Sequence, residues 1–235
     1  MQHNHISTQF DVQLEQVRSK VLHMGGAVED QLSLAVRALK SGEMFLIEQV
    51  LDVELQVNAL EMEIDGLCTN IIARRTPTAI DLRVLTMVVK TITDLERVGD
   101  EAKKIALMAR EFFRNGRGYM PRYTEIQRMS AIVIDMLRQA LDAFARLDAE
   151  AAPEIARRDL GVDDSFRAIL RELLTYMIED PRTISATLDI VFVAKALERV
   201  GDHAKNISEY VVYMIKGKDV RHLSAEEIEQ AVKSQ

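Results

Sequence analysis

The chain has 235 residues, enough for one large domain or two modest ones, and its composition favours helices. It contains only 4 Pro and 10 Gly, aromatic residues make up 5% and Trp is absent, so we expect an all-α protein. The net charge is −7, from 30 basic and 37 acidic residues, which excludes the electrostatic footprint of a nucleic-acid-binding protein. No apolar run approaches the ~20 residues of a membrane span, and the lone Cys68 suits a reducing compartment. We therefore expect a cytoplasmic protein with no direct membrane insertion.

The first half of the chain predicts three long helices. Apolar residues recur at the i, i+3 and i+4 spacing of one helical face over three stretches, which are residues 10–39, 50–71 and 84–109. Gly42 is suited to the C-terminal cap of the first helix, and Pro77 ends the second because proline cannot continue a helix begun upstream. Residues 114–122, RNGRGYMPR, have the composition of an interdomain linker.

The second half repeats the first. An offset of 105 residues places apolar positions on one another: Val21 on Ile126, Val28 on Val133, Leu32 on Leu137, Leu39 on Phe144, Leu55 on Leu160, Val57 on Val162 and Ile64 on Ile169. The offset falls to 104 between Pro77 and Pro181 and to 102 between Glu96 and Glu198, so the lost residues lie in a connection. Pro153 is expected in the first turn of the fifth helix.

Short connections between long amphipathic helices favour antiparallel neighbours, so each half is predicted to be an up-down-up three-helix bundle. We assign residues 1–115 to the first bundle, residues 121–217 to the second and residues 218–235 to a C-terminal tail. The predicted fold is thus all-α, with two tandem bundles that repeat one another in sequence.

The six letters LERVGD occur at residues 95–100 and again at 197–202. Glycine inside a helix costs about 1 kcal/mol against alanine, and like charges at i and i+4 repel by about 0.2 to 0.5 kcal/mol. The offset reveals a second such pair in each half, so the four pairs are Glu54 with Asn58, Glu96 with Asp100, Asp159 with Asp163 and Glu198 with Asp202. The two members of each pair project from the same face of a helix.

Two interpretations of these pairs stay open. Converging carboxylates bind hard cations, and Gly99 and Gly201 would allow a neighbouring helix or a cluster of ions to approach closely. Alternatively the acids form a solvated face, the glycines mark tight helix packing, and the LERVGD arginines pair with acids elsewhere. The cation site is expected to be weaker in the first bundle, because Asn58 carries no charge and Lys104 is placed to neutralise Asp100.

No catalytic constellation is visible in the sequence. There is no G-x-x-x-x-G-K-[ST], G-x-S-x-G, H-E-x-x-H or C-x-x-C motif. His203 lies about 100° around the helix from Asp202, so we expect it to be a solvated or a core histidine. We do not expect an enzyme.

With LERVGDEAKKIA and LERVGDHAKNISEY on the third helix of each bundle, the chain resembles the PhoU family of phosphate-signalling regulators over nearly its whole length. The stretches RRTPTAIDLR, YMIEDPRTI and IKGKDVRH are also similar to that family. The resemblance implies a negative regulator, a homodimer, that couples the PstB-like ATPase of the phosphate ABC transporter to a PhoR-like sensor histidine kinase. It would repress the phosphate-starvation response when phosphate is plentiful.

The resemblance also implies that the acidic motifs bind metal, since some family members hold metal ions, including multinuclear iron clusters. The metal could be iron, manganese, nickel, zinc or magnesium. Carried over to this sequence, the ligands are Glu54, Glu96, Asp100, Asp159, Asp163, Glu198 and Asp202. Asn58 departs from the acidic pattern.

Two alternatives to this function stay open. One is a helical interaction module that binds no metal. The other is a carboxylate-bridged metalloenzyme of the ferritin-like kind, which would use Glu-x-x-His pairs, and neither Glu96 nor Glu198 begins such a pair.

Overall fold

The computed structural model describes residues 8–114 and 123–234, and within them every regular element is a helix. The predicted all-α class is confirmed. The elements in chain order are α1 (Thr8–Ser41), α2 (Met44–Arg75), α3 (Ala79–Arg114), α4 (Tyr123–Arg146), η1 (Ala149–Ala151), α5 (Ala152–Glu179), η2 (Pro181–Thr183), α6 (Ile184–Lys216) and α7 (Ala225–Lys233). No helix among the described residues is long and apolar enough to cross a membrane.

The helix ends follow the local signals in the sequence. Gly42 adopts a left-handed conformation (φ 70°) after α1, and its N–H donates to the carbonyl of Ala38 at 2.8 Å. Pro153 lies in the first turn of α5, and Pro181 begins the short η2 turn that joins α5 to α6. The linker predicted at residues 114–122 lies outside the described residues except for Arg114.

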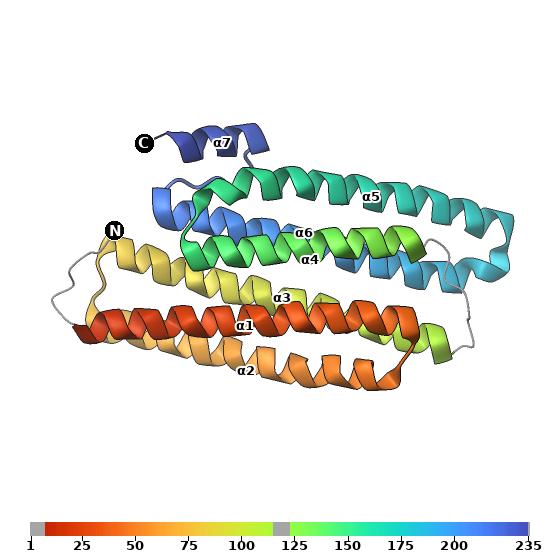
Figure 1. The fold of residues 1–235 in the computed structure, drawn as a ribbon, viewed down its shortest axis with the longest axis horizontal. Coiled ribbons are helices and arrows are strands. Elements are labelled where there is room, and N and C mark those ends of the chain that lie inside the picture. Colours follow the sequence, from red (N-terminus) through yellow and green to blue (C-terminus); the bar gives the residue numbers. More distant parts are fainter. Residues whose placement is uncertain (1–7, 115–122, 235) are drawn as a thin grey trace.

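The helices form two three-helix bundles side by side, α1 to α3 and α4 to α6 (Figure 1). Their central contact is between α3 and α6, while α2 and α5 lie on opposite outer sides (Figure 1). Buried apolar side chains of all six long helices belong to one contiguous core. The two repeats therefore share a core, and they do not behave as separate units joined only by a linker.

The segment assigned to a C-terminal tail contains the helix α7. Ser224 and Glu227 form a capping box, in which the Ser224 hydroxyl accepts from the Glu227 N–H and the Glu227 carboxylate accepts from the Ser224 N–H. The apolar face of α7, with Ile228 and Val232, packs in a second small core over α5 and the end of α6. This core fixes the segment between α6 and α7 through the buried Val220.

Candidate functional site

Each glycine of the repeated LERVGD sequence faces a buried acid on the neighbouring helix. A Cβ atom on Gly99 of α3 would lie 3.3 Å from Glu54 Oε2 on α2 and 2.9 Å from Gln31 Oε1 on α1. A Cβ atom on Gly201 of α6 would lie 3.3 Å from Asp159 Oδ1 on α5. The glycines therefore make room for two buried carboxylates, and this close approach accounts for their presence inside a helix.

A lysine on the same helix as the glycine binds each of these acids. Lys103 Nζ lies 3.4 Å from Glu54 Oε1, and Lys205 Nζ lies 3.1 Å from Asp159 Oδ2. A buried carboxylate without a counter-charge is costly, so each lysine stabilises the acid opposite it. These lysines were not predicted from the sequence, although both stand three residues after the end of LERVGD.

Asp100 takes its counter-charge from Lys103 and not from Lys104. Lys103 Nζ lies 3.9 Å from Asp100 Oδ1 as well as close to Glu54. The expectation that Lys104 neutralises Asp100 is wrong, because Lys104 Nζ lies 3.0 Å from Glu101 Oε1, one turn along the same helix. The positive charge near Asp100 therefore comes from Lys103.

The residue that packs on the buried acid from the first helix of each bundle differs between the two bundles. In the first, Gln31 Nε2 donates to Glu54 Oε2 at 2.9 Å. The offset of 105 residues places Met136 at the equivalent position of the second bundle, and a thioether donates no hydrogen bond. Asp159 Oδ1 is accordingly buried with no hydrogen-bond partner within the described part of the chain. The second cluster thus holds an unpartnered carboxylate oxygen.

Two other acids of the second cluster pair with cations on their own helices. Both Glu198 carboxylate oxygens accept from Lys195 Nζ, at 2.6 and 2.5 Å, and Asp163 Oδ2 lies 3.9 Å from Arg167 Nη2. Asp202 makes no hydrogen bond or salt bridge to any described residue. One carboxylate of the four therefore has no direct counter-ion there.

Burial and then repulsion between neighbouring carboxylates raise the pKa of one acid in each cluster. Asp202 is exposed on one side, yet its pKa is raised to about 6. The main cause is desolvation by the protein on its other side, and the second is repulsion from the nearby carboxylates of Glu198, Asp159 and Asp163. In the first cluster, burial raises the pKa of Glu96, and the neighbouring carboxylates of Asp100, Glu61 and Glu54 raise it further. Both clusters concentrate negative charge that a cation would offset.

The donor types suit a hard cation, but the side chains are not assembled around one. Among residues 8–114 and 123–234, no group of three or more His, Cys, Asp or Glu side chains is placed to hold a metal ion. Lysine and arginine groups lie beside the carboxylates instead, as described above. The assignment of seven metal ligands from the sequence stays a prediction.

Polar contacts join the third helices of the two repeats, and in each the acid is buried. Arg199 Nη1 lies 2.8 Å from Glu101 Oε1, and His203 Nδ1 lies 2.6 Å from Asp94 Oδ1. His203 is buried, so of the two alternatives it is the core histidine. Neither acid was predicted from the sequence, because their partners lie about a hundred residues away in the other bundle.

The fold and the paired clusters define a duplicated helical-bundle protein in which each repeat carries the same acid, lysine and glycine arrangement. The model of the PhoU domain family matches residues 21–109 and again residues 126–211. The chain belongs to the PhoU family. The double match coincides with the duplication found in the sequence.

Known relatives are similar over nearly the full chain. The phosphate-specific transport system accessory protein PhoU homolog of Pseudomonas putida is 48% identical over 94% of this chain and 86% of its own length. The accessory protein PhoU of Escherichia coli K12 is 42% identical over 96% of this chain and 93% of its own length.

Two solved structures share the fold. The crystal structure of PhoU from Pseudomonas aeruginosa superposes with a TM-score of 0.86 at 46% identity, covering 89% of this chain and 100% of that one. The phosphate transport system regulatory protein PhoU from Streptococcus pneumoniae gives 0.81 at 26% identity, covering 90% of this chain and 99% of that one.

Proposed function

We propose that this chain is a cytoplasmic accessory protein of phosphate-specific transport, acting as a regulator and not as an enzyme. It couples the PstB-like ATPase of the phosphate ABC transporter to a PhoR-like sensor histidine kinase and represses the phosphate-starvation response when phosphate is plentiful. The observation that carries this proposal is the 48% identity to a phosphate-transport accessory protein over 94% of the chain. A homodimer is proposed on the same family resemblance.

A cation held by the paired acids is the second part of the proposal. The ligands in the second bundle are Asp159, Asp163, Glu198 and Asp202, and those in the first are Glu54, Glu96 and Asp100. The unpartnered, buried Asp159 Oδ1 supports binding in the second bundle, because a buried acceptor without a partner is unfavourable. Iron, manganese, nickel, zinc and magnesium are the candidates, and the ion would supply positive charge that draws the two helices together.

Lys205 and Lys103 compete with a metal ion for the buried acids. Each ammonium group already neutralises a buried acid of its cluster, so a metal ion must compete with it. The proposed site is therefore one in which cation binding displaces a lysine and changes the local arrangement of the third helix. Such a change is a means of coupling the ion to a docking surface.

The test is an affinity purification of the tagged chain from phosphate-replete cells of its own organism. The proposal expects the transporter ATPase and the sensor kinase among the recovered proteins, and their loss when the tag is on an unrelated helical protein. Recovery of neither partner would contradict the regulatory role. The alternative of a metal-free interaction module predicts partners but no metal, so elemental analysis of chain purified without chelator separates the two.

A further inference from the structure

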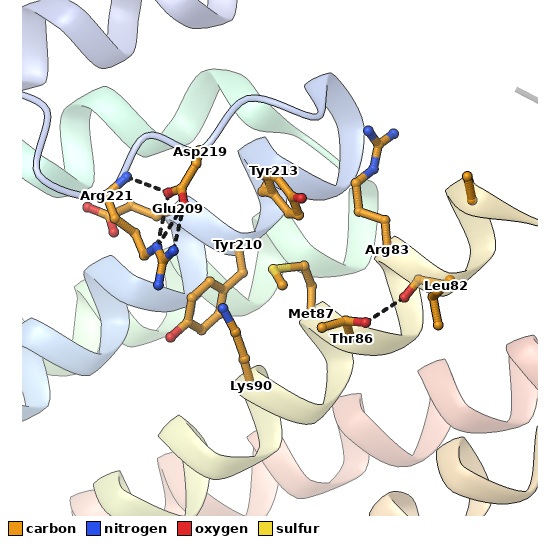
Figure 2. A pocket seen from close by; sticks show the side chains of 11 residues that line it. Leu82, Arg83, Thr86, Met87, Lys90, Glu209, Tyr210, Tyr213, Asp219 and Arg221 are labelled. Carbon is orange, nitrogen blue, oxygen red and sulfur yellow. Dashed lines mark hydrogen bonds and ion pairs between the residues drawn. The ribbon is translucent and has the colours of Figure 1, made fainter. Parts of the chain in front are cut away.

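A cavity of about 380 Å³ opens between the two bundles, and none of the residues of the acidic pairs lines it. Its walls come from the start of α3, the last turns of α6 and the segment that leads to α7 (Figure 2). This volume lies in the range of small-molecule sites, roughly 300 to 1,000 Å³. The segment includes part of IKGKDVRH, a stretch to which the proposed function gives no role.

Three cationic side chains line the cavity. Lys90 and Arg221 lie on the side of Tyr210, whereas Arg83 lies beside Tyr213 (Figure 2). Lys90 Nζ is 5.7 Å from the centre of the Tyr210 ring, and Arg83 Cζ is 5.9 Å from the centre of the Tyr213 ring. Neither Lys90 nor Arg83 forms a salt bridge with any described residue, and Arg83 Nε is buried without a hydrogen-bond partner there.

The acids of the cavity do not cancel this charge. Asp219 is bound to Arg221 through Nε at 2.9 Å and Nη2 at 2.6 Å, and this pairing lowers its pKa to about 2. Burial raises the pKa of Glu209 to about 7, so this acid is only partly ionised at neutral pH. Three cations therefore face one fully ionised carboxylate, in a protein whose net charge is −7.

The segment that carries Arg221 is fixed in place, whereas Arg83 and Lys90 lie on α3. Gly217 has a φ of 68°, and a Cβ atom on it would overlap the guanidinium group of Arg83. Val220 is buried in the small core under α7, and the Arg221 N–H donates to Asp219 Oδ1 at 3.1 Å. The segment is thus placed by packing and hydrogen bonds before any ligand arrives, which lowers the entropy cost of binding.

We propose that this cavity binds the phosphate group of a small phosphorylated molecule. Lys90 and Arg221 contact the phosphate oxygens, because guanidinium and ammonium groups are the strongest donors for that group. The body of the ligand lies over Met87 towards Arg83, since the cavity is larger than a phosphate ion needs. Free inorganic phosphate offers the same chemistry and is the other possible source. This inference goes beyond the proposed function and does not depend on it.

The test is isothermal titration calorimetry of the full chain with AMP, inorganic phosphate and adenosine. Tris chloride buffer passed over a chelating resin keeps metal ions from bridging the ligand to the acidic pairs. Binding of AMP without binding of adenosine supports the site, and equal affinities for AMP and inorganic phosphate support it with the free ion as ligand. Binding of adenosine as tightly as AMP, or binding of neither phosphate compound, would overturn it.

Charge-removing variants locate the binding. Arg221→Gln and Lys90→Gln are each expected to weaken binding roughly tenfold or more, as for loss of a charge-assisted hydrogen bond. Lys40→Gln, with the same charge change on an exposed residue at the far end of α1, is expected to leave affinity within about twofold. Arg83→Gln tests the opposite wall if the other variants do not keep the wild-type melting temperature. Unchanged affinity in folded cavity variants would overturn the proposal.

Discussion

Arg199, inside the second LERVGD sequence, binds Glu101, the residue that directly follows the first. The Nη1 to Oε1 distance is 2.8 Å, and the Glu101 side chain is 3% exposed. The contact joins α6 to α3, which form the central seam between the bundles. The repeated sequence therefore serves two purposes. The glycine of each copy makes room for a buried acid within its bundle, and the arginine of the second copy, Arg199, links the two bundles to each other.

Replacing Arg199 tests this link. In Arg199→Gln, the buried Glu101 keeps only Lys104, so we expect a loss of about 1 to 3 kcal/mol in the free energy of unfolding. The repeat-equivalent Arg97 is exposed, so Arg97→Gln is expected to change stability by no more than about 0.5 kcal/mol. Urea unfolding of both variants measures the difference. Equal effects would show that the Arg199 contact adds no stability.

Replacing a packed glycine by alanine is expected to lower stability, although alanine has the higher helix propensity. In Gly99→Ala the new methyl group would press on the buried Gln31 amide at 2.9 Å, so we expect a net loss of about 1 to 2 kcal/mol despite the favourable propensity of alanine. At Gly161 in α5, a methyl group would meet no neighbouring atom within 4 Å, so Gly161→Ala is expected to gain roughly 0.5 to 1 kcal/mol. Thermal melts compare the two directly, and a gain in both would remove close packing as the reason for Gly99.

The two acidic clusters are predicted to differ in affinity for metal. In the full chain, freed of metal and titrated with Mn²⁺, Glu198→Gln should weaken the tighter site at least about tenfold, because it removes one of four charged ligands. The repeat-equivalent variant Glu96→Gln should leave that site unchanged, since the first cluster offers three acids and an amide. Equal losses in both variants, or no binding by the wild type, would contradict the ranking of the sites.

Glu209 predicts a pH dependence of stability. Its pKa is about 7 in the folded protein against 4.5 as its ordinary value, so the folded state holds the proton more tightly. The protonated Glu209 therefore contributes its full share to the free energy of unfolding below about pH 4.5, and this contribution is lost as the pH rises to about 7. Glu209→Gln should therefore raise the free energy of unfolding at pH 8, by at most about 3 kcal/mol, and change little at pH 4.

The groups that face Glu209 define the control for that experiment; they are Lys205, Asp159, Asp219 and Arg221. The exposed Glu154 lies outside this set, so Glu154→Gln should keep the wild-type pH dependence. Urea unfolding at several pH values provides the comparison. A parallel shift of the whole curve in Glu209→Gln, at pH 4 as at pH 8, would show that its proton is not involved.

The sequence predicted what is local or repeated. Gly42, Pro153 and Pro181 located helix ends because caps and proline act within a few residues. The helix α7 was missed although Ser224 and Glu227 carry the capping-box spacing in the sequence. Its nine residues offer few apolar positions from which a helical face can be identified.

What was not predicted depends on how the two bundles meet. Periodicity identifies an apolar face but not the face that meets the other repeat, so the pairing of Asp94 with His203 could not be inferred. The same limit applies to the cavity beside Arg221, which exists only where α3, α6 and the segment before α7 come together. Alignment of repeats has its own limit, since Leu55 and Leu160 match each other yet are both exposed.

The measurement that tests the account most directly is a reporter of phosphate-starvation genes in cells that lack the chromosomal copy and express a variant. The wild-type chain is predicted to repress the reporter in phosphate-rich medium, and Glu198→Gln with Asp202→Asn to repress less while losing bound metal. A control with the same charge change, Glu154→Gln with Asp164→Asn at exposed positions, should repress like the wild type. Full repression by the metal-free double variant would contradict a role of the paired acids in signalling, and no repression by the wild-type chain would contradict the proposed function itself.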